Sequence, residues 1–600
     1  MTKTIASSKI NYIPSPTSTL LGMMSNEKIL DKFHEVCQIQ PNSLAIRTGS
    51  IEYTYQSLNH FSDCLAVELL TRTNHTNKVV AIYGKRSAAL IVTMFACLKA
   101  GFTFAVLGHA YPKERLKKMA AIITPSLIVG IETGQADLDD LFDTFEATPK
   151  LSVNLKTLEI LSKQNIQLPA CTSSANDIAY LLFTSGTTGL PKCIQTSHQP
   201  LVHFIAWYTR TFDVSSGRQF SMFSGLGHDP VLRDIFVPLS TGGTLHIPDN
   251  SIISNPIKMF DWIQSSKIEY MHVTPQLLRL ICSGGKEKEL PDLRYVFCGG
   301  DVLRASHSKE LKTIASDASL VNFYGATETP QAMGYHVVDH HNPTDPIPIG
   351  VGISDVQLLV MTDDMQLAKQ GEKGQIVIRT HFLSKGYLND ANATSSQFIK
   401  SPFTDDPDDR IYLTGDYGYF QEDGTIVGLG RIDDQVKIRG FRVELLEITT
   451  ALESHPFIQN AIVLANKAPN GESRLAAYLI SASGVDVSDE ALELIKAAMA
   501  QKLPDFMIPS HFLWIDTIPL LPNGKLDREK LPSVEIEQDN NQQAEGIEGY
   551  LINEWKYILG THHINPNKSF VELGGDSLSF IQASMVVEKA IGWLPVDWEK

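Results

Sequence analysis

Short apolar runs of strand length alternate with helical patterns from about residue 28 to about residue 430. The run KVVAIYG is followed by SAALIVTMFACLKAG, and amphipathic stretches separate the runs SLIVGI, DIAYLLF and TLHIPD. This alternation predicts βαβ units, in which helices cover parallel sheets, and therefore an α/β fold. A region of about 400 residues is too large for one hydrophobic core, so we expect packed subdomains.

The longest apolar tract runs from Ala89 to Leu107 and is interrupted by Lys99 and Gly101. A membrane-spanning helix needs about 20 consecutive apolar residues without such interruptions. The tract therefore predicts a buried helix, a turn and a strand.

The pattern changes after Arg431. The segment RIDDQVKIRGFRVELLEI predicts a short hairpin that leads into a helix, within a small α+β unit over 431–532. Residues 533–547 have the polar composition of a linker, and 548–600 contain two amphipathic helices, the second starting at Ser577. Residues 1–27 are rich in Ser, Thr and Pro, which predicts a flexible arm.

The composition narrows the class of protein. Apolar residues make up 43% and charged residues 20%, which excludes a mostly disordered chain. A formal charge of −16 argues against general binding to nucleic acid or to anionic membranes. The seven cysteines form no C-x-x-C pair and the N-terminus lacks a signal pattern, so we expect reduced thiols and a cytoplasmic location.

A loop suited to phosphate follows the predicted strand IAYLLF. Glycine N–H groups and hydroxyl groups can surround phosphate oxygens there, and Lys192 can neutralise their charge. Leu190 and Pro191 separate glycine from lysine, which disfavours a Walker-type loop. By composition alone, an ordinary surface loop fits equally well. The candidate phosphate-binding residues are Thr184, Ser185, Gly186, Thr187, Thr188 and Gly189.

The complete loop resembles that of the adenylate-forming superfamily, which contains non-ribosomal peptide synthetase adenylation domains, acyl-CoA synthetases and luciferases. The resemblance extends over roughly 40–530, through TYQSLNHFSDCLA, LKAGFTFAVLGHAYPKERL, NFYGATE, GQIVIRTHFLSKGYL, YLTGD, GRIDDQVKIRGFRVELLEI and LPNGKLDR, in that order. It implies a large N-terminal adenylation subdomain over 28–430 and a small, mobile C-terminal subdomain over 431–532. Cys193 departs from the pattern, because the family usually has glycine there.

The resemblance implies that a substrate carboxylate attacks the α-phosphate of ATP and gives an acyl adenylate and pyrophosphate. Lys525 would bridge the carboxylate and the α-phosphate as the main catalytic cation, and Lys192 and Thr327 would contact phosphate. Glu328 would bind Mg²⁺, a hard cation that prefers carboxylate oxygen. Asp433 would be the hinge about which the small subdomain rotates.

The nucleotide residues also follow from the resemblance. It implies that Tyr324 stacks on adenine, that Asn322 bonds the adenine amino group, and that Asp416 accepts hydrogen bonds from the ribose hydroxyls. The remaining residues expected beside the nucleotide are Gly299, Gly300 and Arg431.

The segment FSGLGHDPVLRDIF occupies the family's substrate-pocket region and is similar to α-aminoadipate reductases. Asp229 matches the aspartate that pairs with the α-ammonium of amino acids. Arg233 would pair with a second carboxylate or polar group on the substrate, or else with Asp229 at i, i+4 on a helix. His272 is a pocket residue or a core histidine. A polar or acidic amino acid such as α-aminoadipate is favoured by the full set, which also contains Phe297, Phe323, Gln331 and Ala332.

The segment FVELGGDSL resembles the attachment motif of a peptidyl carrier domain. It implies that a phosphopantetheinyl transferase adds 4′-phosphopantetheine to Ser577, which can also be a helix N-cap. Few residues follow Ser577, so we expect an incomplete carrier domain over 548–600 and a downstream synthetase, reductase or acyltransferase domain as partner.

Two other functions remain open at this point. One is an acyl-CoA synthetase that uses free coenzyme A, and the other is a non-catalytic carrier or scaffold module. The charged residues Lys192, Glu328, Asp416 and Lys525 argue against the scaffold, because no fold requires them.

Overall fold

The structure is a computed structural model of the 600-residue chain. It describes residues 25–592 except 74–76, 164–166, 187–189, 286–287, 432–434, 439, 468–472, 484, 486–487, 520–525, 533–545, 560–563, 565–569, 571–572 and 574–576. No helix among the described residues is long and apolar enough to cross a bilayer.

A nine-stranded sheet forms one half of the large subdomain. Its central strands pair in parallel, whereas β2 and the β13–β14–β15 edge are antiparallel. In spatial order the strands are β15 (Val351–Gly352), β14 (Thr329–Val337), β13 (Ser319–Ala326), β12 (Tyr295–Cys298), β11 (Tyr270–Val273), β9 (Gln219–Ser221), β10 (Thr244–Ile247), β1 (Leu44–Thr48) and β2 (Ile51–Thr54).

A seven-stranded sheet forms the other half, with a parallel centre and antiparallel β8 and β18 at one edge. Its strands are β18 (Gly386–Tyr387), β8 (Lys192–Ser197), β7 (Ile178–Thr184), β4 (Thr103–Gly108), β3 (Val79–Gly84), β5 (Leu127–Ile131) and β6 (Lys150–Val153). Strands β4 and β5 are buried along their whole length, as expected for strands covered on both faces.

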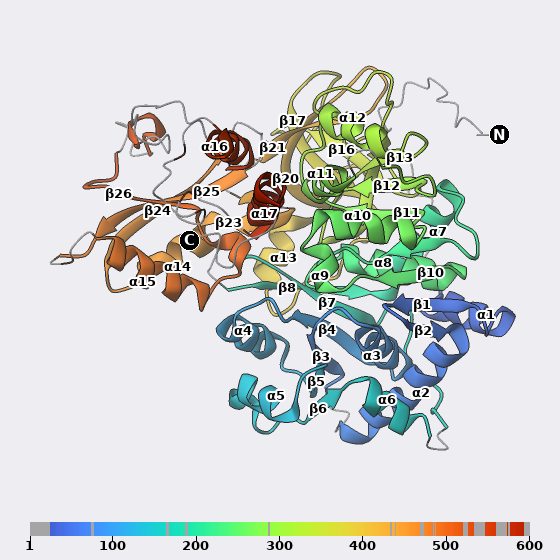
Figure 1. Ribbon diagram of the computed structural model, residues 1–600. Coiled ribbons are helices and arrows are strands. Elements are labelled where there is room, and N and C mark those ends of the chain that lie inside the picture. Colours follow the sequence, from blue (N-terminus) through green and yellow to red (C-terminus); the bar gives the residue numbers. More distant parts are fainter. Residues whose placement is uncertain are drawn as a thin grey trace.

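Helices cover both sheets, and one apolar core joins them. Figure 1 shows the seven-stranded sheet, blue to cyan, below the mainly green nine-stranded sheet. The helices are α1 (Asp31–Ile39), α2 (Tyr55–Arg72), α3 (Ala88–Lys99), α4 (Lys113–Ile123), α5 (Gln135–Leu141), α6 (Leu155–Leu161), α7 (His198–Thr211), α8 (Pro230–Thr241), α9 (Asn250–Ile253), α10 (Pro256–Ser265), α11 (Pro275–Gly284) and α12 (Ala305–Ile314).

The longest apolar tract folds as predicted. Helix α3 begins after Ser87, whose hydroxyl accepts a hydrogen bond from the Leu90 N–H and so caps the helix. Every residue of α3 is buried, and a short turn leads directly into β4. The ammonium of Lys99, which interrupts the tract, bonds Asp63 at 2.7 Å, so this buried charge has its partner.

The prediction of parallel sheets is wrong for the end of the large subdomain. The strands β16 (Gln357–Met361), β17 (Gly374–Arg379), β20 (Arg410–Phe420), β19 (Phe398–Lys400) and β21 (Ile426–Arg431) form an antiparallel sheet. Parallel pairing requires a long crossover, usually a helix, but only α13 (Ala391–Gln397) lies in this region. The connections are mostly too short for crossovers, and the strands therefore pair as hairpins.

The small subdomain has the predicted hairpin, β22 (Gln435–Ile438) and β23 (Phe441–Glu444), which leads into α14 (Leu445–Glu453). A three-stranded sheet follows, with β24 (Ile458–Lys467), β25 (Ser473–Ser481) and β26 (His511–Trp514), and with α15 (Asp489–Ala500) before β26. This subdomain, orange in Figure 1, has its own apolar core. The predicted domain boundaries themselves stay predictions.

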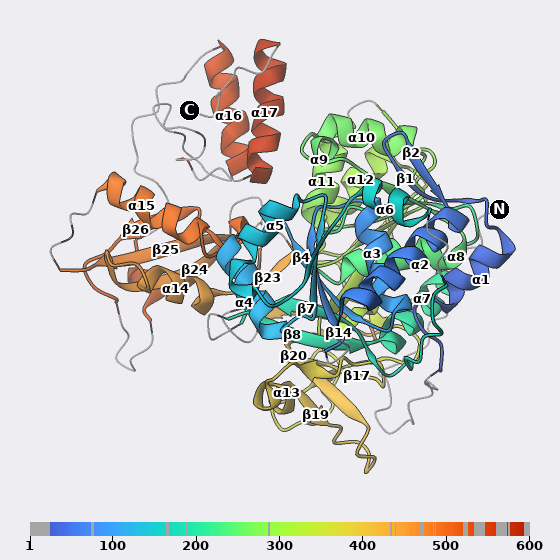
Figure 2. The same cartoon turned by 90° about the horizontal axis from the view of Figure 1, so that it is seen from below.

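Two further helices follow, α16 (Gly546–Leu559) and α17 (Ser577–Ile591), as predicted. They lie side by side in Figure 2 and share a small core that contains Phe570 and Leu573. The guanidinium of Arg474, on β25, donates to the carbonyl oxygens of Ile558 and Leu559 and thereby joins the small subdomain to the end of α16.

Candidate active site

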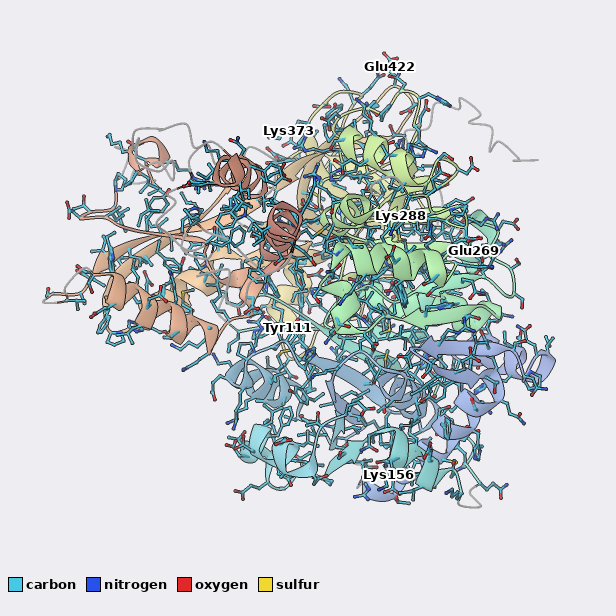
Figure 3. All side chains as sticks on the ribbon, in the orientation of Figure 1. Tyr111, Lys156, Glu269, Lys288, Lys373 and Glu422 are labelled. Atoms are coloured by element: carbon cyan, nitrogen blue, oxygen red, sulfur yellow. The ribbon has the colours of Figure 1, made fainter. Side chains whose placement is uncertain are left out.

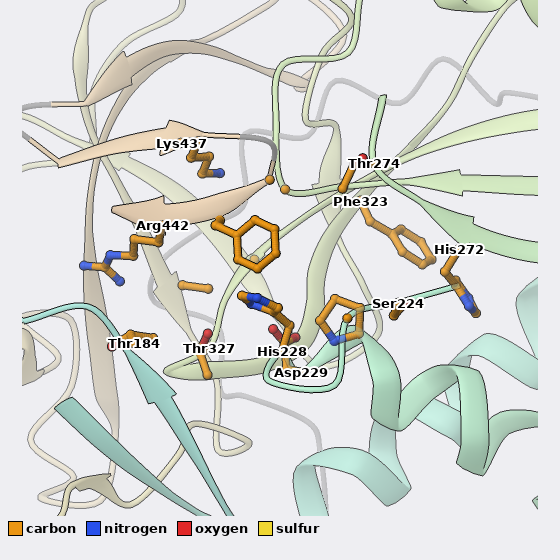
Figure 4. A pocket seen from close by; sticks show the side chains of 18 of the residues that line it. Thr184, Ser224, His228, Asp229, His272, Thr274, Phe323, Thr327, Lys437 and Arg442 are labelled. Atoms are coloured by element: carbon orange, nitrogen blue, oxygen red, sulfur yellow. The ribbon is translucent and has the colours of Figure 1, made fainter. Parts of the chain in front are cut away.

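A cavity of about 470 Å³ lies between the large and the small subdomain. The carboxyl ends of parallel strands β9, β11 and β12 border it, together with the segments that follow β7 and β13. Open α/β sheets bind ligands at this edge, where loops leave the strands. Figure 4 shows the hairpin of the small subdomain on one side of the cavity and the loop that carries His228 and Asp229 on the other. Tyr111 also lines the cavity and lies where the two subdomains meet, whereas Lys156, Glu269 and Lys288 lie farther away (Figure 3).

Asp229 lines the cavity at the end formed by α8 and lies directly before that helix. Pro230 occupies the first position of this helix, where its missing N–H costs nothing. The side chain of Asp229 is half-buried, and burial raises its pKa to about 6, although the charge of Arg233 acts in the opposite direction. A raised pKa means that the carboxylate lacks sufficient compensating charge in the absence of a ligand.

Arg233 lies on the first turns of α8 and lines the same end of the cavity. Only 7% of the residue is exposed, and its guanidinium lies 5.9 Å and 5.5 Å from the ring centres of Phe204 and Phe323. Among the described residues it forms no ion pair within 4.0 Å, and its Nε atom has no hydrogen-bond partner. The predicted alternative, a helical ion pair with Asp229, is therefore not formed.

His272 combines the two roles that the sequence left open. Its Nδ1 atom lies 2.8 Å from Oδ1 of the buried Asp234, whose other oxygen accepts from the Ser224 N–H at 2.9 Å. Burial lowers the pKa of His272, so the ring is neutral at neutral pH. Its Nε2 atom has no partner in the described structure, and the residue lines the cavity. Asp234 thus fixes the ring while one nitrogen remains available.

The other predicted pocket residues also lie on the cavity wall. The amide nitrogen of Gln331 donates to the Asp229 carbonyl at 3.2 Å, and its amide oxygen has no partner among the described residues. This glutamine has a φ of 69°, an uncommon conformation for a residue other than glycine. Four more residues of the predicted set line the cavity, namely Phe297, Gly299, Phe323 and Ala332. Their roles toward a substrate stay predictions.

Three of the residues predicted to contact the nucleotide, Tyr324, Asp416 and Arg431, line the same cavity and contact one another. The hydroxyl of Tyr324 donates to Oδ2 of Asp416 at 2.7 Å, and Arg431 lies 3.3 Å from Oδ1 of the same carboxylate. Strands β20 and β21 place Asp416 opposite Arg431 in register, which explains their contact. Gly300 also lines the cavity, with a φ of 88°.

Asn322 differs from its predicted neighbours. It is buried on β13, and its amide nitrogen donates to the carbonyl oxygen of Pro348 at 2.8 Å. It is not among the described residues that line the cavity. Its predicted bond to adenine therefore has no support from the cavity geometry and stays a prediction.

The described part of the phosphate loop is held by the small subdomain. Thr184 ends β7, Ser185 donates from Oγ to the Arg442 carbonyl at 2.8 Å, and the Gly186 N–H donates to Glu447 at 3.4 Å. Lys192 begins β8, with its ammonium 5.3 Å from the ring centre of Tyr387. It does not line the cavity as described.

Glu328 is 1% exposed and follows Thr327, which lines the cavity. Tyr387 donates to its carboxylate at 2.7 Å, and Nη1 of Arg442 lies 3.0 Å and 3.1 Å from its two oxygens. Burial opposes ionisation of Glu328, but the charge of Arg442 and the Tyr387 hydrogen bond outweigh it and lower the pKa.

The described residues contain no group of three His, Cys, Asp or Glu side chains that could hold a metal by themselves. Mg²⁺ usually binds one or two carboxylates together with substrate phosphates and water. A single buried carboxylate beside a phosphate loop fits an ion that arrives with the nucleotide, and Glu328 is the residue that would hold it.

The small subdomain contributes residues that sequence reasoning missed. Arg442 and Glu447 contact the large subdomain as above, and Arg115 on α4 lies 2.5 Å from Glu447. Phe441 stacks on Phe506 at 3.9 Å and packs edge-on against His228. The charged positions within FRVELLEI, a few residues after the predicted joint between the subdomains, were the signal that could have found them, since charges in an apolar pattern need partners.

Several predicted residues lie outside the described part of the chain. They are Thr187, Thr188, Gly189, Asp433 and Lys525, and the side chain of Ser577 is also not described. The backbone of α17 begins at Ser577, and Ile581, one turn later, lines the cavity. The start of α17 is therefore within one helical turn of a residue on the cavity wall.

Comparison with known families assigns most of the chain to two family models. The model of the AMP-binding enzyme family matches residues 33–388, and that of the AMP-binding enzyme C-terminal domain matches residues 447–525. The chain belongs to the AMP-binding enzyme family. Proteins similar to this chain include a peptide synthetase, an aminoadipate reductase and a solved non-ribosomal peptide synthetase protein.

Gramicidin S synthase 2 of Brevibacillus brevis is 30% identical over 588 residues, which are 96% of this chain and 13% of that protein. L-2-aminoadipate reductase of Schizosaccharomyces pombe is 29% identical over 95% of this chain and 46% of its own. This chain thus spans less than half of either relative. A holo non-ribosomal peptide synthetase protein with adenylation and PCP domains, bound to a vinylsulfonamide inhibitor, matches with a TM-score of 0.77 at 25% identity, covering 96% of this chain and 94% of that one.

Proposed function

We propose that this module activates an amino acid with an acidic or polar side chain, α-aminoadipate being the favoured candidate. ATP would supply the adenylyl group, and pyrophosphate would leave. The acyl group would then be transferred from AMP to the thiol of a phosphopantetheine attached at Ser577 of the carrier domain, and AMP would leave. The observation that carries the choice of substrate is a pair of opposite charges, on Asp229 and Arg233, that share one buried end of the cavity without bonding each other.

Asp229 would bind the α-ammonium group of the substrate. Even a partly buried carboxylate is costly unless a cation pairs with it, and the rise of the Asp229 pKa to about 6 reflects this cost. Binding of an ammonium group would restore the charge balance. Acids without an amino group would leave the carboxylate unpaired, so they should be poor substrates.

Arg233 would bind the far end of the substrate. Its guanidinium is almost fully buried against two aromatic rings, and an arginine in such a place prefers a planar carboxylate partner. The free nitrogen of His272 and the free amide oxygen of Gln331 add further polar contacts. The similarity of this chain to L-2-aminoadipate reductase agrees with a side chain that ends in a carboxylate.

The reacting carboxylate would lie between these residues and the nucleotide. Asp416, held by Tyr324 and Arg431, would accept the ribose hydroxyls, and Tyr324 would contact the base. Glu328 would hold the Mg²⁺ that accompanies ATP and neutralises phosphate charge. Lys192 and Lys525 would add positive charge during phosphoryl transfer, in which enzymes act mainly by positioning and charge stabilisation.

Attachment of a phosphopantetheine group at Ser577 is consistent with the place of this residue at the start of α17, close to the cavity. When bound, this group supplies a thiol that accepts the acyl group from AMP. Mass measurement of the chain after incubation with coenzyme A and a phosphopantetheinyl transferase tests the assignment. The S577A variant, which lacks the hydroxyl, should gain no mass.

The test of the substrate is ATP–pyrophosphate exchange with three matched acids of equal chain length. These are α-aminoadipate, norleucine, which lacks the side-chain carboxylate, and adipate, which lacks the ammonium group. We expect exchange to be fastest with α-aminoadipate, about 100-fold slower with norleucine, and slowest with adipate, since an unpaired buried charge costs about 3 kcal/mol or more.

The R233M variant makes the same test from the protein side. Methionine fills similar space without charge, so the preference for α-aminoadipate over norleucine should disappear or reverse. Equal exchange with both acids in the unmodified protein would contradict the role of Arg233, and fastest exchange with adipate would contradict that of Asp229. Absence of exchange with every amino acid would contradict the proposed function as a whole.

A further inference from the structure

Asp234, on α8, is a buried carboxylate whose two oxygens both accept hydrogen bonds. Oδ2 accepts from the Ser224 N–H at 2.9 Å, and Oδ1 lies 2.8 Å from Nδ1 of His272. The side chains of Asp234 and His272 are 0% and 4% exposed, so water does not share these bonds. An ionised carboxylate only accepts, and Nδ1 of His272 therefore carries the hydrogen. The other nitrogen of the neutral ring, Nε2, is then an acceptor.

The backbone around Ser224 keeps Asp234 in this orientation. Nη2 of Arg86 donates to the carbonyl oxygens of Phe223 and Ser224, at 3.1 Å and 2.8 Å. Ser224 is thus held by its C=O on one side and by its N–H on the other. Because an N–H group can only donate, the oxygen of Asp234 that faces it has to remain an acceptor.

The cavity side of His272 presents a second acceptor as well. His272 and Phe323 both line the cavity (Figure 4), and Nε2 of His272 has no partner within the described ranges. The amide nitrogen of Gln331 donates to the Asp229 carbonyl, so its unpartnered amide oxygen is also an acceptor. A substrate carboxylate likewise only accepts, and it gains nothing from either group while the ring is neutral.

The charges around His272 keep the ring neutral before a substrate binds. Asp234 favours a proton on the ring, but burial and the positive charge of Arg233 oppose it, and burial prevails and lowers the pKa. The charge of Arg86 acts on Asp234 from the far side. The other rings beside His272 carry no charge at neutral pH, since burial raises the pKa of the only phenol among them; these rings are Tyr208 on α7, Phe297 on β12 and Phe323 on β13.

A substrate with a side-chain carboxylate reverses this balance. Under the proposed function, that carboxylate pairs with Arg233 and cancels the positive charge that opposes a proton on the ring. His272 then lies between two carboxylates, that of Asp234 at Nδ1 and that of the substrate at Nε2. Negative charge on both sides favours the protonated ring, which donates from both nitrogens.

We propose that Asp234 is a positioning residue that makes His272 take up a proton as a dicarboxylic amino acid binds, so that the side-chain carboxylate and a proton are recognised together. This inference rests on the proposed function and adds the means by which a carboxylate is distinguished from an uncharged side chain. The proton comes from solvent, is held at Nε2 of His272, and returns to solvent when the acid leaves the pocket. An apolar side chain of the same length leaves the ring neutral.

Titration calorimetry counts this proton. The full-length chain, with magnesium and the α,β-methylene analogue of ATP, which forms no adenylate, is titrated at about pH 7.5 with α-aminoadipate or norleucine. The measurement is made in PIPES and in Tris, whose heats of ionisation differ greatly, so the dependence of the binding heat on the buffer gives the number of protons taken up.

α-Aminoadipate should take up about one proton more than norleucine. Asp229, with a pKa of about 6, is ionised at this pH, and its small contribution is the same for both acids. Because the proton is needed only for the side-chain carboxylate, exchange with α-aminoadipate should also fall as the pH rises above 7, while exchange with norleucine stays level. Equal proton numbers for the two acids would overturn the proposal.

The D234N variant tests the positioning role. The asparagine oxygen still accepts from the Ser224 N–H, so the NH₂ group faces Nδ1 of His272. Nδ1 then becomes the acceptor, the ring hydrogen moves to Nε2, and the neutral ring donates to a carboxylate without an added proton. D234N should therefore bind both acids with equal proton numbers. A difference as large as in the unmodified chain would overturn the proposal.

The matched control is D355N, which makes the same change beside another histidine. Nε2 of His203 lies 3.6 Å from Asp355, and neither residue is on the described cavity wall. Asp355 has a φ of 61°, a conformation that asparagine also tolerates. D355N should retain the difference of about one proton.

The H272Q variant tests the ring itself while leaving Asp234 in place. Its amide cannot take up a proton, so the difference between the two acids should vanish. A difference that persists in H272Q would assign the proton to another group and overturn the proposal, whatever the behaviour of D234N.

The proposed function can fail separately from this inference. ATP–pyrophosphate exchange with α-aminoadipate and norleucine tests adenylation and substrate choice without counting protons. A chain that prefers α-aminoadipate in exchange but binds both acids with equal proton numbers would retain its proposed function and lose the proton-linked recognition. A chain that neither binds nor exchanges any amino acid would lose both.

Discussion

The charged side chains at the two ends of the cavity differ in whether they are paired. At the end formed by α8, Asp229 and Arg233 both come from one short segment of the large subdomain, and neither forms an ion pair within 4.0 Å among the described residues. Near the predicted phosphate loop, Glu328 and Arg115 belong to the large subdomain, and their partners Arg442 and Glu447 come from the small one.

The two ends therefore differ in where the opposite charges come from. We call the end with Asp229 and Arg233 the fixed wall, because both residues belong to the large subdomain, and the end with Glu328 and Arg115 the exchangeable wall, because their partners belong to the small one. Unpaired charges on a rigid helix are suited to a ligand that brings its own opposite charges. Charges that are paired across two subdomains can exchange those partners for ions without leaving either side uncompensated. Under the proposed function, the cost of a buried charge would select the substrate at the end formed by α8.

Removal of the negative charge of Asp229 should lower kcat/KM for amino acids more than any other change. In D229N the α-ammonium group would be buried without an anion, which costs about 4 kcal/mol and lowers kcat/KM for amino acids about 1,000-fold. ATP–pyrophosphate exchange measures the effect. The control D261N alters a surface carboxylate that pairs with Lys288, and it should have no effect. A loss of less than tenfold in D229N would mean that another group binds the ammonium.

The second largest effect is expected from a side chain that obstructs the contact between the hairpin β22–β23 and the large subdomain. Gly440 has a φ of 84°, and an added Cβ would lie 2.7 Å from the Thr274 methyl carbon. In G440V we expect transfer of the acid to the carrier to fall about 100-fold, since overpacking costs about 1–3 kcal/mol and valine strains this backbone. Radiolabelled amino acid bound to the carrier gives the measurement.

The matched control for this variant is G371V. Gly371 has a φ of 72° and nothing within 4 Å of an added Cβ, so it carries the same backbone strain without the contact. It should transfer the acid almost normally. An equal loss in both variants would attribute the effect to strain and remove the argument for close approach of the subdomains.

The pH dependence of kcat/KM tests whether Asp229 binds the ammonium group of the substrate. Burial raises the pKa of Asp229 to about 6, so the carboxyl gains a proton as the pH falls through this value and can no longer pair with an ammonium group. Exchange with norleucine should therefore decline about tenfold per pH unit below 6 and be level above it. His228, with a pKa lowered to about 4 by burial, should not contribute to this decline.

The D229N variant supplies the check on this profile. It has no group to titrate at that position, so its residual exchange should lack the inflection near pH 6. Persistence of the same inflection would assign it to a different group.

The smallest effect is expected where the small subdomain meets the carrier segment. Arg474 donates to the last carbonyl groups of α16, where a positive charge also meets the negative end of the helix. R474Q should weaken this contact by about 0.5–1 kcal/mol and slow transfer to the carrier about threefold, with adenylation unaffected. An unaltered transfer rate would show that the contact does not position the carrier segment.

The apolar pattern predicted the fold well where each element has its own signal. Helix α3, strand β4 and the hairpin before α14 are strongly patterned segments, and they form as predicted. The antiparallel sheet of β16, β17, β20, β19 and β21 was missed, because a single strand does not reveal the direction of its neighbour. That direction depends on the connection, and the connections here are mostly short.

The site was predictable to the extent that its residues belong to continuous segments. Asp229, Arg233, His272 and Asp416 were chosen from such segments, and the structure places all four on one cavity wall or the other. The contact of Glu447 with Gly186 joins residues 261 positions apart, and no local pattern encodes such a pairing. Sequence alone could show that these charges needed partners but not which partners they find.

The placement of Arg442 and Glu447 on one short segment has a consequence for chimeric synthetases. A small subdomain grafted from a relative would bring its own residues at these two positions, and they must match Glu328 and Arg115 of the recipient. Grafts that exchange 435–447 together with its two receptors should therefore remain functional more often than grafts that separate them, whatever acid the recipient selects.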